Sequence, residues 1–85
     1  MTAYKCSDKE WNEIIDILLH ICTKYDIESR SNFGDHCAWI RPEENVAPFF
    51  VYGEIVKRLE YRENIKIKEP KESFIDKNTI EVHRK

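Results

Sequence analysis

The sequence has few of the residues that mark flexible chains, phosphate-binding loops or membrane spans. Its 85 residues include only two glycines and three prolines, which excludes collagen-like and low-complexity chains. The two glycines lie far apart, so a glycine-rich loop for nucleotide phosphates is also excluded. The longest nearly apolar run, 46–52, contains a proline and is much too short to cross a bilayer. Because the N-terminus also lacks an apolar stretch of signal-peptide length, we expect a cytoplasmic protein that does not enter a membrane.

The three cysteines, Cys6, Cys22 and Cys37, have no CxxC spacing, so neither a disulfide framework nor a zinc ribbon is indicated. His20 and Cys22 point in different directions on a helix, and the adjacent His36 and Cys37 would point to opposite faces of a strand. We therefore predict free thiols, no metal site and no cofactor.

An excess of charge of either sign is also lacking. The chain carries 14 basic and 16 acidic side chains, for a net charge of −2, whereas proteins that bind nucleic acids usually have a basic excess. Residues 57–85 carry nine basic and six acidic groups, and 65–83 resembles the wing of a winged helix. A hairpin-like segment stands where the helix-turn-helix should precede that wing. DNA binding is therefore kept only as the last alternative.

Two segments have helical patterns. Ser7 and Glu10 form a capping box, and apolar residues then recur at helical spacing from Trp11 to Tyr25, which predicts a helix over 8–25. A second helix is predicted over about 46–62, with Asn45 as its N-cap and Pro48 in its first turn. Gly53 in its middle suggests close backbone packing, and Asn64 is expected to end the helix in a left-handed conformation.

Short alternating segments predict strands. Residues 37–40 read as a strand that pairs with 30–33 through a turn in which Gly34 takes a positive φ. Residues 65–68 alternate like an edge strand with lysines outward, and 79–83 alternate in the same way. Phe74 and Ile75 suggest either a further short strand or an anchored loop. The most economical fold is a single α+β domain over 1–85, with two helices packed on one face of a small, mainly antiparallel sheet.

Catalysis is not expected. Asp35, His36 and Cys37 are adjacent in sequence, but a nucleophile and its base must meet in space and a third group must orient the base. Nothing in the sequence selects His20, His83 or Arg41 as an activator of Cys37. With neither a nucleophile elbow nor an oxyanion-hole loop, we predict a protein that is not an enzyme and has no catalytic residues.

The second helix is apolar on nearly every side at its start, from Val46 to Tyr52. Such a helix end has to be covered by something, which favours a partner protein or a second copy of the chain. We therefore predict a small non-enzymatic binding protein that acts through protein–protein interaction, as an inhibitor or immunity-type factor, and that forms a homo-oligomer.

The main alternative is a binder of a small anionic ligand such as a nucleotide, with its pocket at a homodimer interface. Aromatic and basic side chains that suit stacking and anion contacts cluster in one short segment. Trp and Tyr are also common anchors of protein interfaces. The residues that we predict to bind a ligand or partner are Trp39, Arg41, Phe33, His36, Arg30 and Tyr52. A Trp between Ala and Ile equally suits a core position, so the role of Trp39 stays open at this point.

Overall fold

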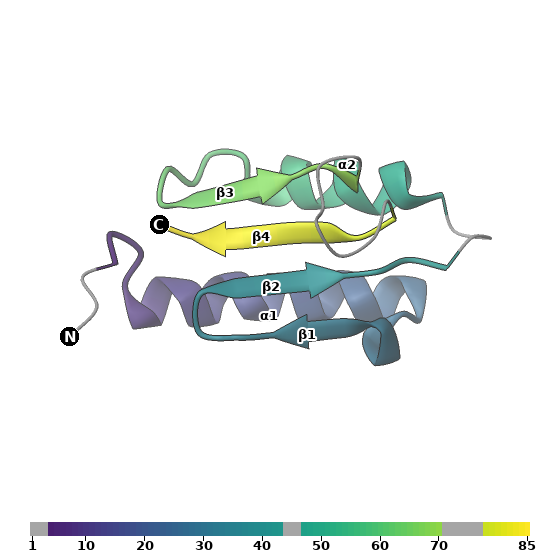
Figure 1. The fold of residues 1–85 in the computed structure, drawn as a ribbon, viewed down its shortest axis with the longest axis horizontal. Coiled ribbons are helices and arrows are strands. Elements are labelled where there is room, and N and C mark those ends of the chain that lie inside the picture. Colours follow the sequence, from purple (N-terminus) through teal and green to yellow (C-terminus); the bar gives the residue numbers. More distant parts are fainter. Residues whose placement is uncertain (1–3, 44–46, 71–77) are drawn as a thin grey trace.

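The computed structural model describes residues 4–43, 47–70 and 78–85. In these residues two helices lie behind a four-stranded antiparallel sheet whose strand order is β1-β2-β4-β3 (Figure 1). The elements are α1 (Asp8–Tyr25), a short 3-10 turn (Glu28–Arg30), β1 (Ser31–Phe33), β2 (Cys37–Ile40), α2 (Pro48–Leu59), β3 (Ile65–Lys68) and β4 (Ile80–Arg84). The predicted α+β fold is therefore confirmed.

Helix α1 has the predicted bounds, and its local signals explain both ends. The Ser7 side chain accepts a hydrogen bond from the Glu10 amide at 3.1 Å, a cap that contributes about 1 kcal/mol. At the other end Asp26 takes a left-handed conformation, with φ 56°, that turns the chain out of the helix. The residues of α1 that are buried in the core are Trp11, Ile14, Leu18, Ile21 and Cys22.

Strands β1 and β2 form the predicted hairpin, but the prediction for its glycine is wrong. No glycine in the described residues has a positive φ. The Gly34 amide instead donates to the Cys37 carbonyl at 2.9 Å, and a Cβ on Gly34 would lie 3.1 Å from the same oxygen. Glycine suits this turn because the two backbone segments approach closely.

Helix α2 is shorter than predicted. Pro48 is its first residue and Ala47 its N-cap, which displaces the predicted cap Asn45, a residue outside the described part of the chain. The helix ends at Leu59, and Asn64 is not left-handed, since Asp26 is the only described non-glycine residue with a positive φ. The Asn64 side chain instead donates to Glu10 Oε1 at 3.2 Å, so tertiary contacts determine its role.

The close packing predicted at Gly53 is also wrong. A Cβ added there would meet no atom within 4 Å, and the residue is exposed. The buried side of α2 consists of Val51, Ile55 and Leu59. These residues face the core, so Gly53 lies on the outer side of the helix.

The two C-terminal strands are confirmed, and β4 lies between β2 and β3 in the sheet. Strand β3 is an edge strand, as predicted, with Lys66 exposed. The hypothesis for Phe74 and Ile75 lies outside the described residues. Ala38 and Ile40 of β2 and Val82 of β4 are buried in the core beneath the helices. Their neighbours along the strands therefore lie on the opposite face of the sheet.

Candidate functional site

The sheet face turned away from the helices carries a set of polar and aromatic side chains. The strand register places Trp39 opposite Glu81, and Cys37 opposite His83. On the edge strand, Lys68 pairs with Glu81 and Lys66 with His83. Because directly paired residues of an antiparallel sheet share a face, these side chains form two rows across the strands.

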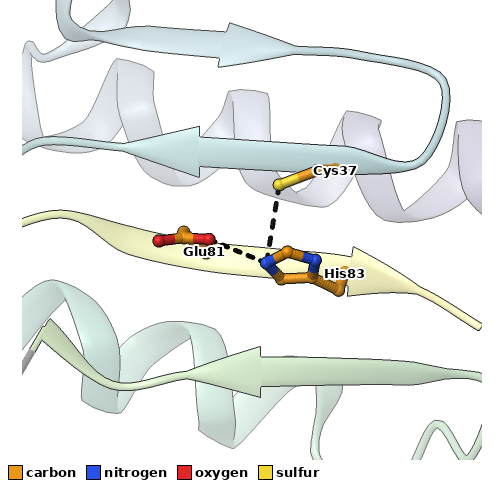
Figure 2. Close-up of side chains that lie close together, drawn as sticks. All are labelled: Cys37, Glu81 and His83. Carbon is orange, nitrogen blue, oxygen red and sulfur yellow. Dashed lines mark hydrogen bonds and ion pairs between the residues drawn. The ribbon is translucent and has the colours of Figure 1, made fainter. Parts of the chain in front are cut away.

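Within these rows Cys37, Glu81 and His83 lie close together (Figure 2). His83 Nε2 is 2.7 Å from Glu81 Oε1 and 3.7 Å from Cys37 Sγ. Glu81 is only 3% exposed, whereas Cys37 and His83 are half-buried. The cluster therefore joins a thiol, an imidazole and a buried carboxylate from the two central strands.

Both contacts of His83 in this cluster involve the same ring nitrogen. In a Cys-His-carboxylate triad the base receives the thiol proton on one nitrogen while the carboxylate holds the other. Burial and the neighbouring charge of Glu81 also raise the pKa of the Cys37 thiol, an effect that Lys68 reduces. A raised pKa favours the protonated thiol, and neither this shift nor the shared ring nitrogen matches an activated nucleophile.

Sequence reasoning missed this cluster because Cys37 and His83 are 46 residues apart. The alternation within 79–83 places Glu81 and His83 on one face, and a strand over 37–40 places Cys37 beside Trp39. Pairing these two predicted strands would have brought the three groups together. The alternating pattern predicts each strand by itself, but it does not predict which strands are neighbours in the sheet.

Three of the six predicted binding residues lie together at the other end of β2. The guanidinium carbon of Arg41 lies 5.3 Å from the centre of the half-buried Trp39 ring. Arg41 Nε donates to Thr79 Oγ1 at 3.2 Å, and Arg30 Nε donates to the Arg41 carbonyl at 2.8 Å. Of the six residues predicted to bind a ligand or partner, the structure therefore brings Arg30, Trp39 and Arg41 together.

The other three predicted residues are dispersed. Phe33 packs against the core, His36 is exposed in the turn between β1 and β2, and Tyr52 packs half-buried against the core from α2. The rings of Tyr52 and Phe49 meet edge-on, with centres 6.4 Å apart. Phe33 and Tyr52 thus lie on the core side of the sheet, away from the face that carries Trp39.

An open cavity of about 730 Å³ lies at the start of α1 and includes none of the six predicted residues. Its walls include Tyr4, Asp8, Asp35 and Arg84. The Arg84 side chain already donates to the Asp8 carboxylate and to the carbonyls of Cys6 and Asp35. The Arg84 guanidinium, the cationic group of this cavity, is thus already hydrogen-bonded to other segments of the chain.

A different surface feature lies on α2. Phe50 is 73% exposed and Phe49 is 51% exposed in the first turn of the helix. Further along α2, Lys57 and Arg58 are exposed. The chain thus presents large aromatic side chains to solvent beside basic groups.

At a significant level the chain matches no protein-family model, no curated protein and no solved structure. The comparisons therefore assign no role to the side chains on the sheet face or to the exposed side of α2. In the described residues, neither helix has the length and apolar character that crossing a membrane requires. The functional argument therefore rests on the geometry of the sheet face and of α2.

Proposed function

We propose that this chain is a non-enzymatic binding protein that docks another protein on the outer face of α2, defined as Phe49, Phe50, Gly53 and Lys57. The observation that carries the proposal is the 73% exposure of Phe50. Large aromatic side chains are enriched among the residues that anchor protein interfaces. Phe49 and Phe50 expose two large aromatic side chains on a domain of 85 residues, and exposed apolar groups of this kind are typical of interaction surfaces.

The α2 outer face has a shape that suits a close partner. Phe50, Gly53 and Lys57 are three and four residues apart, so they lie along one side of the helix. Gly53 has open space where a side chain would be. A partner backbone can therefore approach the helix axis at Gly53, with the phenylalanines on one side of the contact and Lys57 on the other.

The charges around this face favour an acidic partner. Lys57, Arg58 and the nearby Lys24 contribute three cations, against the carboxylates of Glu54, which pairs with Lys24 and Arg58, and of the exposed Glu60 at the end of the helix, so the net charge of these groups is positive. Glu54 also accepts a hydrogen bond from Tyr25, so its carboxylate is already engaged in contacts within the chain. A second copy of the chain would bring the same cations together across the interface, which costs free energy. We therefore infer an amphipathic helix with an apolar anchor and carboxylates as the occupant.

This mode of action requires no chemistry on the partner. Covering a partner's functional helix is sufficient for inhibition, in line with the inhibitor or immunity-type role expected from the sequence. The raised pKa of Cys37 and the shared nitrogen of His83 agree with a function that uses no nucleophile.

The experiment is a site-specific photocrosslink. A photoreactive phenylalanine analogue replaces Phe50 in the cells that make the protein, and the crosslinked polypeptide is identified by mass spectrometry. The partner is then purified and its affinity is measured by titration calorimetry. We expect Phe50→Ser to weaken binding by roughly tenfold or more, as for a central interface anchor. Lys57→Glu should weaken binding and flatten its dependence on salt.

Tyr61→Ser is the matched control, because Tyr61 is 68% exposed but lies beyond the end of α2. It should leave the affinity unchanged. Crosslinking only to a second copy of the chain would overturn the proposal of a different acidic partner. Equal affinities for the wild type and Phe50→Ser would overturn the α2 outer face as the docking surface.

A further inference from the structure

The Cys37–Glu81–His83 cluster differs from an ordinary set of surface polar residues in how its atoms converge. One ligand atom from each side chain lies within 4.8 Å of the other two. Each side chain offers a different donor, namely sulfur, nitrogen and oxygen. Among the residues that the structure describes, this is the one group of three or more such side chains that could hold a metal ion.

All three ligand atoms lie within 4.8 Å of one another, and the separation between Cys37 Sγ and His83 Nε2 already matches the spacing that a tetrahedral metal ion imposes. Zinc binds nitrogen and oxygen at about 2.0–2.2 Å and sulfur at about 2.3 Å, which places its ligand atoms roughly 3.3–3.7 Å apart. Cys37 Sγ and His83 Nε2 are 3.7 Å apart without any movement. The 2.7 Å contact between Nε2 and Glu81 Oε1 has to open by about 0.6 Å, so that the ion replaces the hydrogen bond.

The backbone holds the three groups on rigid elements. Cys37 and His83 are directly paired across β2 and β4, and Glu81 lies two residues before His83 on the same face. Glu81 is 3% exposed and hydrogen-bonded to His83, so its carboxylate is held near the other two ligand atoms before any ion binds. Sites built on paired strands need little reorganisation to bind, which increases affinity.

The charges of the three ligands match a divalent cation. A thiolate and a carboxylate neutralise two positive charges, and the neutral imidazole provides the third ligand. Lys66 and Lys68 on β3 are paired with His83 and Glu81, so their positive charges oppose a cation at the site. Three protein ligands leave a fourth position for water or an exchangeable ligand.

We propose that Cys37, Glu81 and His83 form a binding site for a divalent transition-metal ion of the zinc type. The sulfur and nitrogen donors select Zn²⁺ and Co²⁺ over Mg²⁺ and Ca²⁺, which prefer all-oxygen sites. On binding, the Cys37 thiol loses its proton to the buffer, a sulfur–metal bond forms and no electrons are transferred. This site lies on the opposite face of the sheet from α2 and does not depend on the proposed docking function.

The test is a Co²⁺ titration of the full chain, stripped of metal and kept reduced. We expect a stoichiometric complex with visible d–d bands of tetrahedral cobalt and a near-ultraviolet thiolate-to-cobalt charge-transfer band. Zn²⁺ should abolish both bands, whereas excess Mg²⁺ should not. Cys37→Ser should remove the charge-transfer band, and His83→Gln should weaken Co²⁺ binding by roughly tenfold or more.

His36→Gln is the matched control for His83→Gln, because His36 is exposed and lies in the adjacent turn. It should bind Co²⁺ like the wild type. Trp39 provides a second readout, since it is paired with Glu81 in the sheet. Bound Co²⁺ should quench its fluorescence, and Trp39→Phe should remove this quenching while keeping the cobalt bands.

Circular dichroism of the metal-free variants checks that Cys37→Ser and His83→Gln still fold. The proposal would be overturned if the folded wild type gave no charge-transfer band at millimolar Co²⁺. It would also be overturned if the band persisted in folded Cys37→Ser, because another thiol would then be the ligand.

Discussion

At the residue scale, Gly34 and Gly53 have opposite surroundings. A Cβ on Gly34 would press against the Cys37 carbonyl at 3.1 Å, whereas a Cβ on Gly53 would meet nothing within 4 Å. Neither residue has a positive φ. A side chain at Gly34 would therefore crowd the Cys37 carbonyl, whereas one at Gly53 would not be crowded, and there glycine reduces helix stability without a compensating contact in the chain.

Gly53→Ala should raise the free energy of unfolding by about 0.5–1 kcal/mol, because alanine restricts the unfolded chain and favours the helix. Urea denaturation followed by circular dichroism measures this change. Gly34→Ala is the matched comparison and should lower stability, since the Cys37 carbonyl is fixed by the hairpin. A loss of stability in Gly53→Ala would contradict the open surroundings of Gly53. If the proposed docking surface is correct, the same stabilised variant should bind the partner more weakly.

At the scale of elements, Glu54 joins the two helices. Its carboxylate accepts hydrogen bonds from Lys24 Nζ at 2.8 and 3.0 Å, from the Tyr25 hydroxyl at 2.9 Å and from Arg58 at 3.3 Å. The Glu54 side chain is 15% exposed. The bonds from Lys24 and then Tyr25 lower the pKa of Glu54, so the folded state favours its ionised form.

Glu54→Gln should therefore destabilise the protein at neutral pH. Because the pKa of Glu54 is lower in the folded chain, its contribution is present above the ordinary glutamate range and is lost as the pH falls through the folded pKa. The difference in urea midpoint between wild type and Glu54→Gln should shrink on acidification. Glu63→Gln, at an exposed position, is the control and should not change the midpoint. A difference that stayed constant down to acidic pH would show that ionisation is not involved.

The elements that local signals define were predictable, and those that depend on distant partners were not. The cap at Ser7 and the apolar spacing of α1 act within a few residues, so its bounds follow from the sequence. The end of α2 was predicted wrongly because Asn64, expected to close the helix, binds Glu10 instead. The Cys37–His83 contact was missed for the same reason, since it depends on which strands are neighbours.

At the scale of the whole molecule, the two ends of the chain are tied to each other. Figure 1 shows the start of α1 and the end of β4 on the same side of the structure, and the Cys6 amide donates to the Lys85 carbonyl at 3.2 Å. The Arg84 side chain, 7% exposed, donates to the carbonyls of Cys6 and Asp35 and to the Asp8 carboxylate. Its guanidinium also lies 4.2 Å from the centre of the Tyr4 ring. One residue of β4 thus joins the N-terminal segment, the start of α1 and the β1–β2 turn.

We expect Arg84→Ala and Arg84→Lys to lower the urea midpoint more than Arg58→Ala does. Lysine keeps the charge but lacks the planar fork that reaches three acceptors from different segments, so it should restore only part of the loss. Arg58→Ala is the control because its side chain is 44% exposed and pairs with Glu54 within α2. A domain of this size has a small core, so the loss of hydrogen bonds between distant segments should produce a measurable change in the urea midpoint.

Salt separates the two physical contributions of Arg84. Two of its acceptors are backbone carbonyls and only the third, Asp8, is charged and exposed. Raising the ionic strength screens the Asp8 pair but leaves the carbonyl bonds intact. The destabilisation by Arg84→Ala should therefore persist in high salt. If it disappears there, or if Arg84→Lys is as stable as the wild type, charge alone holds the chain ends together and the fork of hydrogen bonds does not.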